Sequence, residues 1–316
     1  MEELITLIVL CYNDESNINR CLESVMNQEY RNLQIIVIND GSKDNSLQHI
    51  QKFAEKDCRI EIIDQPNKGV AESRNVGIAH ARGSFVAYLD SDDYIDSGYI
   101  SEMVRYQKEN NADIVCSSVA WWAITGTEIH PFRICDTVTT FDDYRIILKK
   151  IYTEPRFKTG IINAFAMLVR RDLFEPGMYP TGRKCEDAWA CIRLYERSRK
   201  TVLIPNILYY YQENPKSIMH TKDTGLILDE INWMTHHFDI WEQKKERELQ
   251  GLISQQICYY ICTNWNHVDA SQKPQLYAIY KKHRKYTISG KSVMLKSRIK
   301  YFVLCSPKLL SLNVFK

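Results

Sequence analysis

The sequence lacks the patterns that mark zinc-binding, disulfide-rich and membrane-spanning proteins. No two of its 10 cysteines are separated by two residues, so a zinc site built on such a pair is not expected. The cysteines are too few and too irregularly spaced for a disulfide scaffold, which predicts buried thiols in a reducing cytoplasm. No run of about 18 apolar residues occurs, so no membrane-spanning helix is predicted.

Acidic residues are absent from the end of the chain. All 39 Asp and Glu residues lie at or before Asp269, whereas 11 of the 41 Lys and Arg residues follow it. An acidic body with a basic end suggests that this end meets something anionic. Residues 291–316 interleave apolar and basic side chains, as an amphipathic helix in a membrane interface does. A terminal helix that packs on the body or on a second subunit fits the same pattern.

Short apolar runs and amphipathic segments alternate through the first 120 residues. The runs 4–10, 34–38, 59–63, 85–89 and 113–116 predict strands, and the segments 16–28, 44–54, 70–81 and 97–108 predict helices. Strands that are apolar throughout, with helices between them, predict parallel βαβ units with both sheet faces covered. The expected fold is therefore an α/β doubly wound sheet, in which ligands bind beyond the carboxyl ends of the strands.

The second half of the chain is less regular. It predicts a loop-rich excursion with a helix near 141–152, a strand at 161–169, a helix at 186–198, and short strands at 201–204 and 207–211. Helical periodicity dominates from residue 223 onward. We therefore expect an α/β domain of residues 1–220, followed by a helical region of residues 221–316 that includes the basic amphipathic tail.

Polar residues follow each of the first four predicted strands. After the fourth come Asp90, Ser91 and Asp92, whose two carboxylates can converge on one hard cation, or on a cation and a ribose. An acidic turn that caps the next helix is the alternative. After the second strand, Asp40 can accept a hydrogen bond from the imide N–H of a nucleotide base, or can belong to a plain turn. Arg74 can pair with the base or a phosphate, or form a surface ion pair.

Glu186 and Asp187 stand where a helix is predicted to begin. Carboxylates are favoured there by the helix dipole, which needs no functional explanation. The functional interpretation is a general base, because a sugar hydroxyl becomes a good nucleophile only when its proton is removed.

Together these residues resemble the family-2 inverting glycosyltransferases of the GT-A fold. The matching motifs occur in the family's order over about residues 4–220: Tyr12-Asn13, Gln28-Glu29-Tyr30, Asn39-Asp40-Gly41-Ser42-Lys43-Asp44, Asn67-Lys68-Gly69, Arg74-Asn75, Asp90-Ser91-Asp92-Asp93, Glu186-Asp187 and Tyr209-Tyr210-Tyr211.

The resemblance implies transfer of a sugar from a nucleotide diphosphate, most simply a UDP-sugar, to an acceptor hydroxyl with inversion. It implies that Asp187, next to Glu186, is the base, and that a Mn²⁺ or Mg²⁺ ion binds Asp92, with His220 near the ion or the diphosphate. The residues expected to bind the nucleotide sugar are Tyr12, Asn13, Asp40, Asn67, Lys68, Arg74, Asp90 and Ser91. An exposed loop histidine is an equally good interpretation of His220.

Some positions depart from the family pattern. The residue after the tyrosine run is Gln212 where the family often has Arg, so a diphosphate or acceptor contact there is not carried over. The acceptor-side segment is Phe165-Ala166-Met167-Leu168, so the acceptor is not carried over either.

A sugar nucleotidyltransferase is a rival function, but the segment 11–16 lacks the Gly-rich basic loop that such an enzyme needs. A non-catalytic nucleotide-sugar-binding module is another.

The partners expected from the resemblance are a nucleotide-sugar donor and a saccharide or lipid-linked saccharide acceptor of a bacterial surface polysaccharide. A membrane surface contacted by residues 291–316 and a homo-oligomer are further candidates. Nucleic acid is not expected, because no aromatic residues flanked by basic ones lie on a plausible sheet face. The expected location is the cytoplasm, peripheral on the inner face of the membrane.

Overall fold

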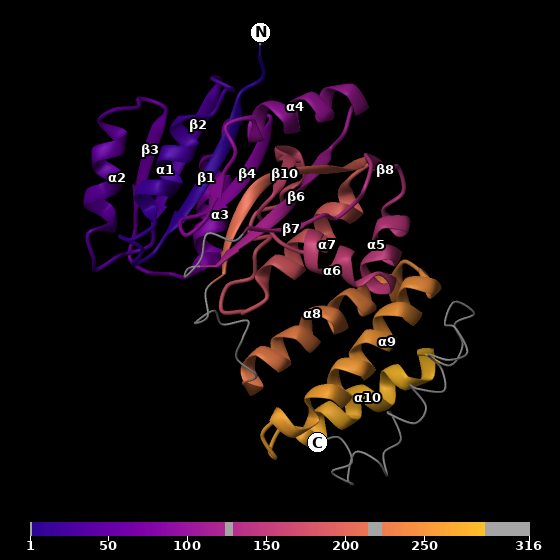
Figure 1. Cartoon of the computed structure of the whole chain (residues 1–316). Coiled ribbons are helices and arrows are strands. Elements are labelled where there is room, and N and C mark those ends of the chain that lie inside the picture. Colours follow the sequence, from indigo (N-terminus) through magenta and orange to yellow (C-terminus); the bar gives the residue numbers. More distant parts are fainter. Residues whose placement is uncertain (1, 124–128, 214–222, 288–316) are drawn as a thin grey trace. The chain divides into compact units, whose positions relative to one another are not determined.

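A mixed β-sheet organises the first part of the chain (Figure 1). In the computed structural model, which describes residues 2–123, 129–213 and 223–287, the sheet has ten strands in the order β3-β2-β1-β4-β9-β6-β10-β5, with β7 beside β6 and β8 beside β10. The strands are β1 (Ile5–Cys11), β2 (Leu33–Asn39), β3 (Ile60–Asp64), β4 (Phe85–Asp90), β5 (Tyr94–Ile95), β6 (Ile114–Ala123), β7 (Ile129–Phe132), β8 (Thr139–Phe141), β9 (Met167–Arg170) and β10 (Thr201–Glu213).

Six of these strands point the same way. β3, β2, β1 and β4 pair in parallel, β9 runs antiparallel between β4 and β6, and β6 pairs in parallel with β10. The carboxyl ends of β1, β2, β3 and β4 therefore lie along one side of the sheet, which we call the carboxyl edge. The polar residues that follow these strands are brought together there.

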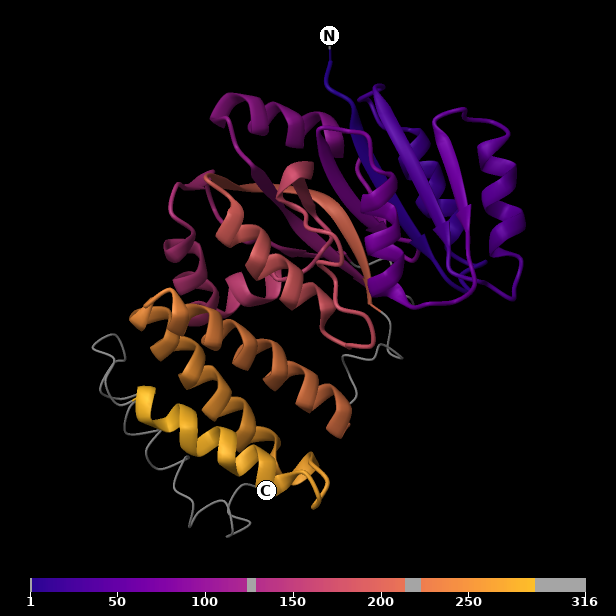
Figure 2. The ribbon, with the colours of Figure 1, turned by 180° about the vertical axis from the view of Figure 1, so that it is seen from behind.

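Helices cover both faces of the sheet (Figures 1 and 2). They are α1 (Ile18–Met26), α2 (Ser46–Ala54), α3 (Val70–His80), α4 (Tyr99–Asn110), α5 (Tyr144–Thr153), α6 (Pro155–Ile161) and α7 (Glu186–Arg197). Because side chains alternate along a strand, Leu7 and Val9 of β1 pack in a core with α1, α2 and α4. Ile8 and Leu10 pack in a second core with residues of α3 and α7. The predicted α/β, doubly wound, mostly parallel sheet is confirmed.

The middle of the chain differs from the prediction. The strand expected at 161–169 is instead the end of α6, an irregular segment and β9. Both parts are apolar and buried, and periodicity does not separate a short buried helix from a buried strand. The excursion after residue 120 contains the end of β6, then β7, β8, α5 and α6. The strands expected at 201–204 and 207–211 form one irregular strand, β10.

The chain divides into two compact units, Met1–Pro215 and Lys216–Lys316. In the second unit, α9 (Arg247–Asn264) packs against both α8 (Thr224–Gln243) and α10 (Lys273–Thr287), which confirms the predicted C-terminal helices. None of the helices within the described ranges is long and apolar enough to cross a membrane. The amphipathic segment 291–316 lies outside the described residues.

Candidate active site

Two loops at the carboxyl edge are joined by hydrogen bonds. Asn13 follows β1 and has a left-handed φ of 51°. Its backbone N–H donates a hydrogen bond to Ser42 Oγ, in the loop after β2, at 2.9 Å. In return, the Lys43 N–H donates to Asn13 Oδ1 at 2.7 Å. Asn is one of the few residues that adopt this backbone conformation readily. Asn13 therefore fixes the relative position of the two strand-end loops, while the neighbouring Tyr12 is exposed.

Asp40 organises the loop after β3. Its buried carboxylate accepts hydrogen bonds from Gln65 Nε2 at 2.8 Å and from the backbone N–H groups of Lys68 at 2.9 Å and Gly69 at 2.8 Å. These bonds hold the loop that carries Asn67 and Lys68, both of which are exposed. The predicted contact of Asp40 to a nucleotide base stays a prediction. The described contacts give Asp40 a structural role at the same edge.

The segment after β4 gathers acidic groups. Ser91 Oγ donates a hydrogen bond to Asp14 Oδ2 at 2.6 Å, which brings Asp14 beside Asp90 and Asp92. Burial, together with the Asp90 and Asp14 carboxylates, raises the pKa of Asp92 to about 7. Arg20 Nη2 donates to the Asp92 backbone carbonyl at 2.6 Å and also contacts Gln212 Oε1. The site therefore carries several like charges that a cation would compensate.

Asp93 anchors this segment to β10. Its fully buried carboxylate accepts a hydrogen bond from the Tyr209 hydroxyl at 2.5 Å and one from the Gln212 N–H at 2.7 Å. Burial and the neighbouring carboxylates of Asp92 and Asp90 raise the pKa of Asp93. Asp93 thus points into the protein, whereas Asp90 and Asp92 remain available to a ligand.

A buried arginine joins β4 to α7. The Arg74 guanidinium contacts Glu186 Oε1, lies 2.7 Å from Asp187 Oδ1 through Nη1, and lies 3.5 Å from Asp90 Oδ1 through Nη2. Its Cζ also lies 5.6 Å from the centre of the Tyr179 ring. Burial and the nearby Asp187 raise the pKa of Glu186, and Arg74 opposes this effect. Arg74 and its three carboxylate partners thus come from three separate segments of the sequence.

The structure places most of the predicted site residues along one edge. Arg74 contacts Asp90, Glu186 and Asp187 directly. The other residues predicted to bind the nucleotide sugar lie on the neighbouring strand-end loops: Tyr12, Asn13, Asp40, Asn67, Lys68 and Ser91. His220 lies outside the described residues. The roles assigned to all of these residues stay predictions.

Sequence reasoning missed three residues that shape this edge. Asp14 directly follows Tyr12-Asn13 at a strand end, so its position was a usable signal. Asp93 belongs to the Asp90–Asp93 motif, but its anchoring role depends on contacts with Tyr209 and Gln212 of β10, which the motif does not indicate. Arg20 gave no signal, because its partners Asp92 and Gln212 lie far away in the sequence.

The residues around Asp92 fit a hard divalent ion. Within residues 2–123, 129–213 and 223–287, no three His, Cys, Asp or Glu side chains form a complete metal cage. Magnesium, however, is usually held by one or two carboxylates, with phosphate oxygens of the substrate and water as the other ligands. Manganese also prefers oxygen ligands. Asp92 therefore fits as the protein ligand of an ion whose coordination a diphosphate would complete.

Comparison with known proteins decides the family. The family model described as "Glycosyl transferase family 2" matches residues 6–177, more than half of the chain. The chain is a member of glycosyl transferase family 2. This confirms the resemblance found in the motifs, and it favours a glycosyltransferase over the rival nucleotidyltransferase.

Two similar bacterial proteins cover different shares of the chain. Glycosyltransferase GlyA of Streptococcus pneumoniae serotype 4 is 30% identical over 222 residues, which are 67% of this chain but only 31% of GlyA. EpsH of Bacillus subtilis is 30% identical over 268 residues, covering 80% of this chain and 76% of EpsH. The chain thus spans less than a third of GlyA and about three quarters of EpsH.

A solved structure supports the fold. The crystal structure of S. aureus TarS 1–349 in complex with UDP-GlcNAc matches with a TM-score of 0.69 at 18% identity, covering 89% of this chain and 81% of that chain. At this identity the likeness concerns the fold alone. It confirms that the family member described here has the predicted GT-A architecture.

Proposed function

We propose that the chain moves a sugar from a nucleotide diphosphate sugar to an acceptor hydroxyl, with inversion at the anomeric carbon. The observation that carries the proposal is the contact of one arginine with both Asp90 and Asp187 at the carboxyl edge. This contact holds the predicted donor-binding carboxylate and the predicted base on the same side of the sheet. A donor and an acceptor bound at this edge would meet between them.

Each residue has a definite task in this proposal. Asp187 takes the proton of the acceptor hydroxyl as that oxygen attacks from the face opposite the leaving group. A positioned carboxylate of this kind typically contributes about 10²–10⁴-fold to the rate. Asp90 holds the ribose, and the loops fixed by Asn13 and Asp40 hold the base. An α-linked donor then gives a β-linked product.

The leaving group needs compensation for its growing negative charge. A Mn²⁺ or Mg²⁺ ion at Asp92 would supply positive charge to the diphosphate. The acidic surroundings of Asp92 support such an ion. The carboxylates available to it, those of Asp90 and Asp92, match the one or two that usually hold magnesium beside substrate phosphates.

The donor and acceptor follow from different arguments. Because TarS has been crystallised with UDP-GlcNAc, UDP-N-acetylhexosamines stand first among the donors to test.

We propose a saccharide or lipid-linked saccharide of a surface polysaccharide as acceptor, reached at the inner face of the membrane through residues 291–316. Flotation with anionic liposomes tests the membrane part: truncation after residue 290 should abolish binding, and unchanged binding would refute it.

A donor screen tests the activity. Purified protein with Mn²⁺ is given each common UDP-, dTDP- and GDP-sugar, and release of nucleoside diphosphate is recorded together with donor binding by calorimetry. We expect one donor class to bind and turn over, and both signals to fall with EDTA. Absence of both binding and turnover for every donor would contradict the proposal.

A further inference from the structure

The burial of Arg74 separates it from the residues that a substrate can touch. The Arg74 side chain is 4% exposed and Glu186 is 8% exposed, whereas Asp90 and Asp187 are 29% and 24% exposed. Arg74 and Glu186 therefore lie behind the two carboxylates that reach solvent. A base or phosphate that entered from solvent would meet Asp90 and Asp187 first.

We propose that Arg74 is a positioning residue, which fixes the Asp187 carboxylate for proton removal, rather than a donor-binding residue. The inference rests on the proposed transfer reaction and assigns Arg74 a different task from the base or phosphate contact that its motif suggests. Arg74 acts through Asp187 and is not itself a catalytic residue.

The geometry suits this task. The planar guanidinium presents several N–H groups in a fixed fork, and here Nη1 faces Asp187 and Glu186 while Nη2 faces Asp90. With Asp187 Oδ1 turned toward Arg74, Oδ2 is the oxygen left for an acceptor hydroxyl. The ring of Tyr179, at 5.6 Å from Arg74 Cζ, and the Tyr88 hydroxyl, which donates to the Arg74 carbonyl at 3.1 Å, hold the arginine itself.

The arrangement also explains why an arginine is needed. Three carboxylates, those of Asp90, Glu186 and Asp187, lie around one buried guanidinium. Lysine presents a single ammonium point charge and lacks the planar fork of N–H groups that reaches all three carboxylates. Arg74→Lys is therefore expected to keep the fold better than it keeps the orientation of Asp187.

The test separates positioning from donor binding. Arg74→Met and Arg74→Lys are compared with wild type for donor affinity by calorimetry, for kcat at saturating donor and acceptor, and for Tm. Because loss of Arg74 leaves buried acids unpaired, Arg74→Met/Glu186→Gln is included as a variant that removes one of those acids as well.

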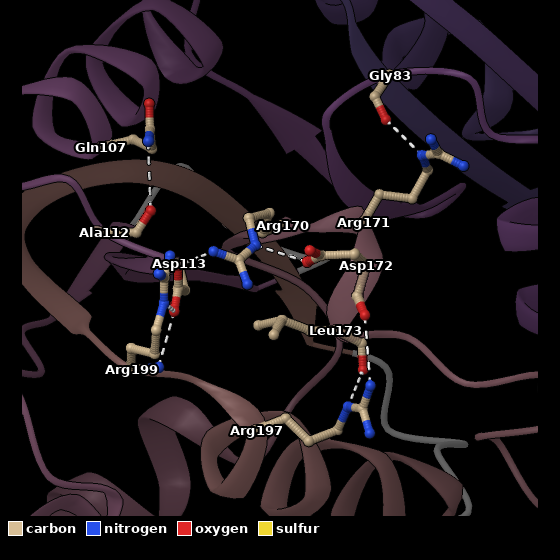
Figure 3. Close-up of polar contacts among 10 residues, drawn as sticks. All are labelled: Gly83, Gln107, Ala112, Asp113, Arg170, Arg171, Asp172, Leu173, Arg197 and Arg199. Atoms are coloured by element: carbon tan, nitrogen blue, oxygen red, sulfur yellow. Dashed lines mark hydrogen bonds and ion pairs between the residues drawn. The ribbon is translucent and has the colours of Figure 1, made fainter.

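A second arginine–carboxylate network provides the matched control. Figure 3 shows Asp113 between Arg170 and Arg199, with Arg199 Nη2 at 3.0 Å from the buried Asp113 carboxylate. Asp113 directly precedes β6, so this network lies at the side of the sheet opposite the carboxyl edge. Arg170→Met disturbs a comparable ion pair in the same unit and is expected to leave kcat unchanged.

The expected result is a split between kcat and binding. Arg74→Met and the double variant should lose about 100-fold in kcat while donor affinity stays within about threefold, since misplacing a reacting group costs rate rather than ground-state binding. The kcat of Arg74→Lys should lie between the values of these variants and that of the wild type. Wild-type kcat in a folded Arg74→Met, or loss of donor affinity with normal kcat at saturation, would overturn the inference. Failure of the proposed function would show differently, as a lack of donor binding and turnover in the wild type.

Discussion

Gly41 lies so close to Asn67 that a Cβ built on the glycine would be 2.6 Å from the Asn67 backbone nitrogen. Gly41 also has a φ of 71°, in the left-handed region. The loops after β2 and β3 therefore meet backbone to backbone at the carboxyl edge, and only glycine permits both the conformation and the approach.

Gly41→Ala should accordingly separate these two loops and weaken donor binding by at least about tenfold, with a loss of about 1–3 kcal/mol in stability. Gly177→Ala is the matched control, because Gly177 has a φ of 70° but a Cβ added there would have no atom within 4 Å. Calorimetry and thermal unfolding compare the two variants. Equal donor affinity in both would show that the contact with Asn67 does not matter for binding.

Asp92→Ala should remove the metal-dependent part of donor binding, by about tenfold or more, because Asp92 is the proposed protein ligand of the ion. Asp96→Ala removes a nearby acid whose Oδ1 instead accepts a hydrogen bond from the Gly98 N–H at 2.8 Å, so it should keep the metal dependence. Donor affinity is measured with Mn²⁺ and with EDTA. An unchanged effect of Mn²⁺ in Asp92→Ala would remove this residue from the metal site.

Tyr209→Phe should lower the free energy of unfolding by about 1–3 kcal/mol, because it removes one of the donors to the buried Asp93 carboxylate. Tyr210→Phe is the control on the same strand, since its ring stacks on Tyr94 at 4.6 Å instead. Chemical denaturation of both variants measures the difference. Equal stability would mean that the hydroxyl of Tyr209 does not stabilise Asp93.

The second unit should lose stability at mildly acidic pH. Burial lowers the pKa of His283 to about 4, from 6.5 in the unfolded chain, and its Nδ1 lies 3.1 Å from Ser254 Oγ. Because the folded-state pKa is the lower one, the unfolded chain binds the proton first as the pH falls below 6.5.

This difference should destabilise the unit by about 2 kcal/mol between about pH 7.5 and about pH 5. Urea unfolding at the two pH values measures it, and His283→Gln should flatten the dependence. If His283→Gln lost as much stability as the wild type between the two pH values, another group would be responsible.

The first four strands and their helices could be predicted because each strand is a short apolar run with polar residues at its end. The carboxyl edge followed from that pattern, since parallel strands place their carboxyl ends together. The prediction of one strand over 161–169 is wrong, because the apolar residues at the end of α6 and in β9 are both buried and periodicity does not tell a short buried helix from a buried strand.

The contacts in the inner part of the site could be found only from the structure. Arg74 and Glu186 are far apart in the sequence, and nothing in either motif indicates that they form a buried contact. The same holds for Asp93, whose burial depends on Tyr209 of β10. Local pattern identifies which residues can carry chemistry, whereas long-range packing decides which of them face a substrate.

The role of Asp187 is the central claim, and Asp187→Asn tests it most directly. The substitution keeps the size of the side chain but removes its ability to accept a proton, so donor affinity should stay near the wild-type value. Transfer should fall by about 10²–10⁴-fold. Asp172→Asn, in the network of Figure 3, is the control and should transfer normally.

The measurement is kcat for transfer at saturating donor, made together with donor binding by calorimetry on the same preparations. Normal binding with transfer reduced to this extent in Asp187→Asn is the predicted result. Wild-type turnover in that variant would contradict the account.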